Sequence, residues 1–346
     1  MATQQSANPE IVSSTHRLRN LAFLCIAAIP FCVLLFMIAK YGVDMPFIDE
    51  WDLVPLIDKA FRGDLTFPDF WAQHNEHRIV FPQLLLVSLA TWTSWNTLYE
   101  LYLMVALAAG ILFFTCKILL RGRPALTQTA FLWLLPVLSA AAFSLRQWEN
   151  WMMGVNNVIY LSVLSAFAGI YLLSSGGFRW GRFWGGAILG IVSTYSFSTG
   201  FAYWPIGLFL LWFTPFPNAR TQRTAMLLWV ILLSSAIGLY MIGYSQPSDL
   251  PRPWEALAHP MDLALYVVLY LGSLMPSSFH ISFLAGITGL AGFCFLAYEL
   301  FKTPGVSRAA LLGLAAIGLF AILNAVITGL GRAETTIYQA MSSRYV

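Results

Sequence analysis

Long apolar segments that carry almost no charged residues dominate this sequence. The first runs from 21 to 39, and an α-helix of about 20 residues crosses the roughly 30 Å hydrocarbon core of a membrane. Eight further segments of this kind cover residues 98–120, 129–145, 158–174, 183–198, 201–214, 225–243, 280–300 and 309–330. Because lipid tolerates only structures that satisfy their own backbone hydrogen bonds, these segments predict an all-α, polytopic transmembrane helix bundle of about nine spans.

The composition excludes a soluble globular protein. Of the 346 residues, 58% are hydrophobic and 10% are charged, whereas a soluble domain has roughly 25% charged residues. The net charge of +3 is small and dispersed, which excludes a nucleic-acid-binding surface. All four cysteines lie inside apolar runs, which predicts structural thiols. No small-residue cleavage site follows the first apolar segment, so we interpret it as a retained span.

Two shorter apolar stretches, 79–93 and 263–276, decide the number of spans and the sides. If both crossed the membrane, the bundle would have eleven spans and three basic loops would lie outside, against the positive-inside rule. If both lie along the interface or re-enter, every basic loop stays in the cytoplasm, and we prefer this arrangement. Residues 1–20 are then a cytoplasmic tail, 21–346 form a single integral membrane domain, and 41–97 form a large first outer loop.

The first outer loop holds half of the 16 acidic residues of the chain, between Asp44 and Glu76. The alternation of apolar and charged residues from 51 to 62 predicts an amphipathic interfacial helix, and a second short helix is predicted to start near Phe67. Asp49, Glu50 and Asp52 place three carboxylates within four positions, where repulsion is costly unless a ligand or cation offsets it. We predict Asp49 or Glu50 as a general base held at the membrane surface.

A compact polar cluster ends the same loop. His74, Asn75, Glu76, His77 and Arg78 precede the apolar stretch 79–93. Histidine and arginine side chains suit the stabilisation of an anionic leaving group, and arginine forms forked contacts with phosphate. The alternatives are an ion-pair lock without a site, and a divalent metal held by carboxylates and the two histidines. No fixed metal motif decides between them.

Two later segments are predicted to share the outer face with this loop. Gln147, Glu149 and Asn150 lie between two spans and are predicted to line the site together with Asp52. The turn 196–205 interrupts an apolar run, which is tolerated where backbone polar groups face a cavity. The final residues, including Arg344 and Tyr345, show neither helix capping nor the composition typical of a chain terminus, so we expect the natural chain to continue beyond them.

Five sequence elements together resemble those of a known group of proteins. They are Asp49-Glu50-Trp51-Asp52, His74-Asn75-Glu76-His77-Arg78-Ile79, Gln147-Trp148-Glu149-Asn150, the turn Ser198-Thr199-Gly200 with Trp204-Pro205, and Ser343-Arg344-Tyr345. With them the chain resembles, over nearly its whole length, a group of uncharacterised bacterial polytopic membrane proteins. Those proteins in turn resemble the GT-C superfamily of membrane glycosyltransferases, through their layout of one span, an acidic outer loop and a multi-span bundle.

The GT-C resemblance implies a sugar donor carried on polyprenyl phosphate or diphosphate and a first-loop acid as catalytic base. At matching positions that base is Asp49, with Glu50 as the second candidate. The chain departs from the better-known members because it has no large soluble C-terminal domain and no Lys-Pro-Pro element in the first loop. These departures leave the acceptor and the phosphate-binding residues open.

We therefore expect an inverting glycosyltransferase of the bacterial cytoplasmic (inner) membrane that acts on the outer face. Its expected partners are a polyprenyl-phosphate-linked sugar, a glycan or lipid acceptor of the cell envelope and membrane lipids, with a divalent metal ion as the candidate cofactor. His74, His77 and Arg78 would offset charge on the departing phosphate. The alternatives are a transporter or flippase of lipid-linked sugars and a non-catalytic membrane assembly subunit.

Overall fold

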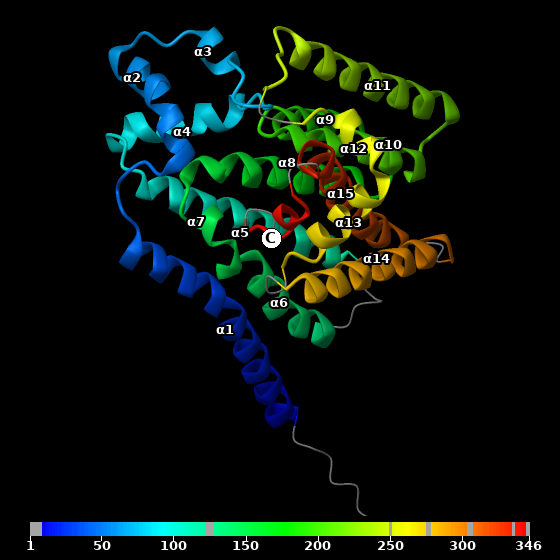
Figure 1. Ribbon diagram of the computed structural model, residues 1–346. Helices are drawn as coiled ribbons and strands as arrows, with labels where there is room; N and C mark the ends of the chain where they lie inside the picture. The colour runs from blue at the N-terminus through cyan, green and yellow to red at the C-terminus, as the bar shows by residue number, and fades with distance from the viewer. Residues whose placement is uncertain are drawn as a thin grey trace, which may run out of the picture.

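Helices account for nearly all regular structure in the computed structural model, which describes residues 9–121, 128–248, 251–274, 278–302, 307–333 and 336–343. Figure 1 shows their arrangement. The α-helices are α1 (Pro9–Tyr41), α2 (Val54–Arg62), α3 (Phe67–Trp71), α4 (Val80–Thr93), α5 (Leu98–Leu120), α6 (Gln128–Ala142), α7 (Trp148–Trp151), α8 (Asn157–Leu173), α9 (Trp180–Thr194), α10 (Tyr203–Phe213), α11 (Ala219–Met241), α12 (Pro253–Ala258), α13 (Pro260–Leu271), α14 (Phe279–Lys302) and α15 (Ser307–Arg332). Five short 3-10 helices are η1 (Ile48–Leu53), η2 (Leu145–Gln147), η3 (Gly154–Asn156), η4 (Ser198–Ala202) and η5 (Ile337–Met341).

Among the described residues, seven stretches are long and apolar enough to cross a membrane, which confirms the predicted class of helical membrane bundle. They are Arg17–Tyr41, Leu98–Leu120, Thr129–Trp151, Gly154–Leu173, Ala219–Met241, Phe279–Lys302 and Leu311–Arg332. The predicted spans 183–198 and 201–214 correspond to α9 and α10, which have only 15 and 11 residues because the turn at Ser198 interrupts the run. The shorter stretches 79–93 and 263–276 are helices α4 and α13, of 14 and 12 residues.

The largest core forms where α8, α9, α10, α11 and α15 pack together. Trp204, Trp229 and Tyr203 are fully buried there. The indole Nε1 of Trp229 donates to the carbonyl of Trp204 at 2.9 Å, and the Nε1 of Trp204 donates to Thr194 Oγ1 at 2.9 Å. Buried indoles need such partners because an unsatisfied N–H away from water is costly. These bonds hold the turn before α10 against α11.

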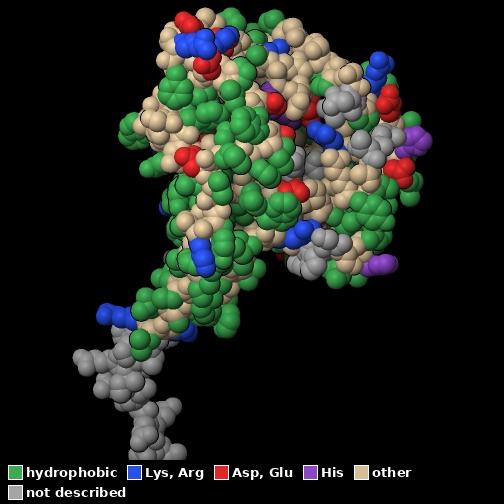
Figure 2. All heavy atoms as spheres, turned by 60° about the vertical axis from the view of Figure 1, so that its left-hand side comes forward, with side chains coloured by type: hydrophobic (Ala, Val, Ile, Leu, Met, Phe, Trp, Pro, Cys, Tyr) green, Lys and Arg blue, Asp and Glu red, His purple; other side chains and the backbone are tan. Residues whose placement is uncertain are grey.

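Other helices leave large apolar faces uncovered. Leu24, Ile29 and Phe36 of α1 are exposed, as are several large apolar side chains of α11 and α14. Exposed apolar surface of this extent suits a lipid environment. Figure 2 shows the flank along α1 covered mostly by hydrophobic side chains, and a group of charged side chains at the top of the view, where α2 and α3 lie.

The predicted amphipathic helices of the first loop are α2 and α3. Helix α2 buries Leu56 and Ile57 and ends at Gly63, which adopts the left-handed conformation with φ of 78°. Helix α3 begins at Phe67, with Pro68 in its first turn, where proline is well accommodated. On the exposed side Lys59 pairs with Asp69 of α3 at 2.5 Å.

The segments that the positive-inside rule places on one face do contact one another in the structure. Hydrogen bonds or ion pairs join Glu50 with Gly154, Gln73 with Ser245, His77 with Ser198, Glu76 with Arg332, and Glu149 with Ser342. In Figure 1 the α2–α4 segment lies at the upper left, beyond the ends of the longer helices. The fold thus gathers the polar segments at one end of the bundle.

Candidate functional site

The cluster from His74 to Arg78 is a tight turn. The backbones of His74 and His77 exchange two hydrogen bonds of 2.9 Å each. Asn75 at its tip is exposed and has a φ of 51°, a left-handed conformation that asparagine tolerates better than most residues. His74 is partly buried, and the turn directs Glu76 and His77 toward α15 and η4.

Arg78 is an anchor for the backbone. Its guanidinium donates to the carbonyls of Tyr240 at 2.7 Å, of Trp71 at 2.5 Å and of Ile242. The side chain is 2% exposed and lies over the ring of Trp71, with 5.1 Å between the guanidinium carbon and the ring centroid. With these donors committed, Arg78 joins α3 to the end of α11. Its role in contacting phosphate stays a prediction.

Glu76 forms an ion pair with a residue from the far end of the chain. Its Oε1 lies 2.8 Å from Nη2 of Arg332, at the end of α15, and 3.5 Å from Nε2 of His77. Burial raises the pKa of Glu76, but the interactions with His77 and Arg332 outweigh it, so the pKa lies below its usual value. Its Oε2 is buried and accepts no hydrogen bond from the described residues.

His77 is neutral at neutral pH. Burial lowers its pKa to about 4, although the adjacent Glu76 opposes this shift. Its ring lies against Phe197 with 4.0 Å between centroids, and Nδ1 accepts a hydrogen bond from the amide of Ser198 at 3.4 Å. Arg332 is therefore the charged partner of Glu76 at neutral pH.

Glu76, His77 and Arg332 lie at a groove of about 970 Å³, a volume within the range of small-molecule sites. Helices α11 and α15 supply much of the apolar wall, which includes Leu233, Ile237, Met241, Ile327 and Leu330. The turn around η4 adds Phe197, Ser198, Thr199 and Phe201, and the start of α12 adds Arg252, Pro253 and Trp254. The groove therefore combines an apolar wall with a polar group of two arginines, one carboxylate and one neutral histidine.

The acidic segment forms η1 and is held in a strained backbone. Ile48 has a φ of 47°, which is unfavourable for a β-branched residue and is typical of constrained positions. Asp49 is partly buried and Asp52 is exposed. Neither Asp49 nor Glu50 is among the described residues that line the groove.

Glu50 is enclosed by backbone. It is 2% exposed, and its carboxylate accepts hydrogen bonds from the amides of Phe47, at 2.7 Å, and of Gly154. Burial raises the pKa of Glu50 although these hydrogen bonds oppose the shift. The carboxylate of Glu50 is therefore less accessible to an acceptor hydroxyl than the partly buried side chain of Asp49.

The predicted residues between α6 and α8 have mainly structural contacts. Gln147 is buried and accepts a hydrogen bond from the hydroxyl of Tyr160 at 2.8 Å, and Asn150 is also buried. Glu149 accepts from Ser342 Oγ at 3.1 Å and so holds the segment after α15. None of these three lines the groove, and Arg344 and Tyr345 lie outside the described residues.

Three charged residues with notable positions in the structure were not predicted as site residues from the sequence. Arg332 and Arg252 line the groove, and Glu100 is buried at the start of α5. Arg332 had one signal, since it follows a long apolar run on the side where basic residues are disfavoured. Glu100 had another, because an acid inside an apolar run is expensive and so points to a specific role. Nothing local distinguishes Arg252.

The described residues provide no group of three histidine, cysteine, aspartate or glutamate side chains that could hold a metal ion. His77 already uses both ring nitrogens, toward Glu76 and Ser198. The described residues therefore do not fit the divalent metal ion that the sequence left open.

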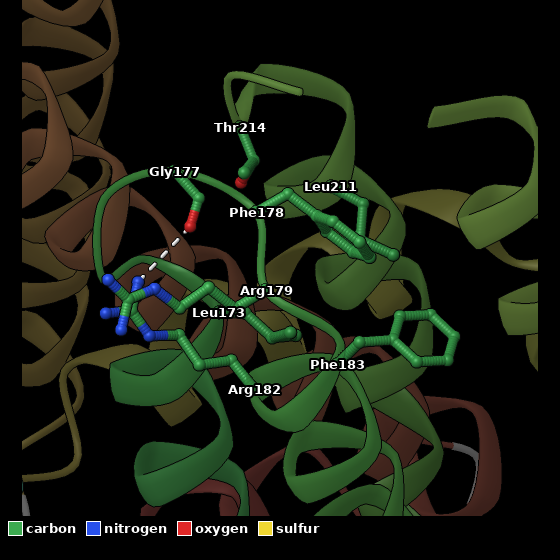
Figure 3. Close-up of a pocket in the computed structure, with 8 residues that line it drawn as sticks. All are labelled: Leu173, Gly177, Phe178, Arg179, Arg182, Phe183, Leu211 and Thr214. Carbon is green, nitrogen blue, oxygen red and sulfur yellow. Dashed lines mark hydrogen bonds between the residues drawn. The ribbon is translucent and has the colours of Figure 1, made fainter. Parts of the chain in front are cut away.

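A second, small pocket near Arg182 carries no ligand site. Figure 3 shows it between Leu173, Phe178, Phe183 and Leu211, with Arg182 hydrogen-bonded to the carbonyl of Gly177 at 3.2 Å. Its volume of about 10 Å³ is no more than one water molecule needs.

Comparisons with known proteins do not assign the site. No protein-family model, no curated protein and no solved structure matches the chain.

Proposed function

We propose that this protein is a membrane glycosyltransferase that takes its sugar from a polyprenyl-phosphate carrier and transfers it, with inversion, to a cell-envelope acceptor. The groove carries this proposal. A lipid-linked sugar has a long apolar chain, an anionic phosphate and a polar sugar, and the groove offers surfaces of each matching kind. The apolar residues of α11 and α15 suit the chain, and Arg332 and Arg252 suit the phosphate.

The proposed reaction needs one base and one cationic group. The acceptor hydroxyl oxygen attacks the anomeric carbon, the bond from that carbon to the phosphate oxygen breaks, and the proton of the hydroxyl passes to a carboxylate. Arg332 lines the groove and offsets the charge on the departing carrier phosphate, whereas Arg78 is buried and donates to three carbonyls. The departing phosphate stays on the lipid carrier.

Two carboxylates compete for the role of base. Asp49 is the residue that the GT-C resemblance indicates, and Glu76 is the carboxylate that lines the groove. The pKa of Glu76 is held below its usual value, which makes its carboxylate a weaker base. We assign the base to Asp49 and give Glu76 the role of positioning Arg332.

The test uses the full chain in lipid nanodiscs with a panel of radiolabelled polyprenyl-phosphate sugars and bacterial membrane extract as acceptor. We expect wild-type protein to transfer label and to release the polyprenyl phosphate. Asp49→Asn should reduce the turnover by at least about 100-fold, the usual contribution of a general base, with unchanged yield and thermal unfolding. Asp58→Asn, which neutralises an exposed acid of the neighbouring helix α2, is the matched control.

Two results would overturn the assignment. Full turnover by Asp49→Asn together with loss in Glu76→Gln would move the base to Glu76. Absence of transfer with every donor, together with movement of the donor across sealed vesicles, would favour a flippase. The positions of the ionisable residues speak against a flippase, since those in the seven membrane-length helices lie near a helix end, whereas transport sites usually lie near the midplane.

A further inference from the structure

Two buried carboxylates meet at Gly154, outside the groove. Glu50 in η1 and Glu100 in α5 are 2% and 1% exposed. A Cβ atom added to Gly154 would lie less than 3 Å from Glu50 Oε1 and from Glu100 Oε2. The two oxygens therefore converge on the same small space from different elements, and only a glycine leaves room for both.

The hydrogen bonds around this pair are incomplete. Glu50 accepts from the amides of Phe47 and Gly154, and Glu100 Oε1 accepts from Nε1 of Trp95 at 3.2 Å. Glu100 Oε2 is buried and accepts no hydrogen bond from the described residues. A buried carboxylate oxygen that faces a second carboxylate without a donor is unfavourable unless a proton or cation lies between them.

No described lysine, arginine or histidine forms an ion pair with either carboxylate. The third acid nearby is Asp44, which caps the start of α5 by accepting from the amide of Thr97 at 2.8 Å. Asp49 and Asp52 of η1 are acids and supply no positive charge, and the other ionisable side chains of the surrounding elements have different contacts or are exposed. Lys40 of α1 lies near the rings of Phe36 and Tyr41, and Glu149 of α7 bonds to Ser342. Lys117 lies at the far end of α5, and helices α4 and α8 carry no charged residue. The charged residues of α2 are exposed, namely Asp58, Lys59 and Arg62.

A proton fits this arrangement better than a metal ion. Hard divalent cations take six or more oxygen ligands, whereas this site offers one or two carboxylate oxygens and the backbone of Gly154 fills the space beside them. Two neighbouring carboxylates in a low-dielectric interior do not both ionise at neutral pH, and the pair then titrates as a unit. The burial that raises the pKa of Glu50 acts in the same direction.

We propose that Glu50 and Glu100 form a proton-binding site, in which one carboxyl keeps its proton and donates it in a hydrogen bond to the other carboxylate. The shared proton then joins the acidic segment to α5 and to η3. It thereby fixes the position of Asp49, which directly precedes Glu50. The proton site stands on its own contacts and does not depend on the glycosyltransferase assignment.

Infrared spectroscopy of the full chain in nanodiscs at neutral pH tests the proton directly. We expect the difference spectrum between wild type and Glu100→Gln to contain the C=O band of an un-ionised carboxylic acid, which shifts in heavy water and disappears as the pH is raised. The Asp58→Asn variant, which neutralises an exposed carboxylate, should retain the band. Wild-type protein without a protonated-carboxyl band at neutral pH would overturn the proposal, and this measurement on wild type does not require any variant to fold.

Thermal unfolding against pH is the second test. A group that holds its proton more tightly in the folded state adds stability at low pH that is lost as the pH rises through its folded-state pKa. We expect the Tm of wild type to fall by about 5 °C or more as alkali removes the shared proton. Glu100→Gln keeps a donor in place of the proton and should lose this dependence. An unchanged alkaline dependence in Glu100→Gln would contradict a shared proton.

Discussion

Arg78 ties two distant parts of the chain together at the level of a single side chain. Its donors reach the carbonyl of Trp71 on one side and the carbonyls of Tyr240 and Ile242 on the other. The amide of Arg78 also donates to the hydroxyl of Tyr240 at 3.2 Å. These bonds fix the turn that carries Glu76 and His77, so the position of the groove residues depends on Arg78.

Replacing Arg78 should therefore destabilise the protein strongly. Arg78→Ala leaves buried carbonyls without donors, and we expect a loss of about 3 kcal/mol or more in the free energy of unfolding. Thermal or denaturant unfolding in detergent measures the effect. Arg62→Ala, which breaks only the exposed pair with Asp58, is the control and should cost less than about 1 kcal/mol. Equal losses in both variants would contradict the anchoring role.

His77 predicts a pH dependence of stability in the acid range. Its pKa is about 4 in the folded protein and 6.5 in an unfolded chain, so acidification protonates the unfolded state first. Stability is thus retained above about pH 6.5 and is lost as the pH falls toward 4, by about 3 kcal/mol in total. His77→Gln should remove this slope when unfolding is measured between pH 7 and 4.5. A slope equal to that of wild type would refute the assignment.

At the scale of elements, α10 packs closely on α11 within the largest core of the molecule. Gly207 of α10 faces the ring of Trp229, and an added Cβ would lie less than 3 Å from that ring. Trp229 is fully buried and also bonds to the carbonyl of Trp204. Because α10 has only 11 residues, it depends on this contact more than a long helix would.

A methyl group at this contact should separate the two helices. We expect Gly207→Ala to destabilise the protein by roughly 1–3 kcal/mol, the usual cost of overpacking. Gly289→Ala in α14 places the same methyl group in open space and should leave the unfolding temperature nearly unchanged. Parallel unfolding curves of the two variants in one detergent provide the measurement. Equal stability of both would show that α10 shifts freely on α11.

At the scale of the whole molecule, the positive-inside rule predicts that the basic loops lie in the cytoplasm. The polar segments, which alternate with these loops along the chain, are then predicted to lie on the opposite side of the membrane. Cysteine labelling tests this in a variant without the four native cysteines, none of which forms a disulfide. We expect a cysteine at Asp64, between α2 and α3, to react with an impermeant reagent added to intact cells, and one at Arg220 to react only after lysis. The reverse pattern would invert the predicted topology.

Much of the fold was predictable because helix formation and hydropathy are local properties. The runs 98–120 and 225–243 correspond closely to α5 and α11, and the charge alternation from 51 to 62 predicted α2. The predicted spans 183–198 and 201–214 are shorter helices than a crossing needs. The sequence did place an interrupting turn at 196–205, and in the structure this turn contains η4 between α9 and α10.

Some features of the candidate site could likewise be predicted from the sequence, whereas others required the tertiary structure. The sequence by itself determined a membrane-type helical bundle, two amphipathic helices and the polar clusters that include Glu76 and His77, since all of these follow from residues near one another in the chain. Only the tertiary structure decided that Glu76 pairs with Arg332, that Glu50 and Glu100 both approach Gly154, and that Arg78 donates to backbone carbonyls. These contacts join residues far apart in the sequence, and they depend on how the helices pack, which no local pattern records.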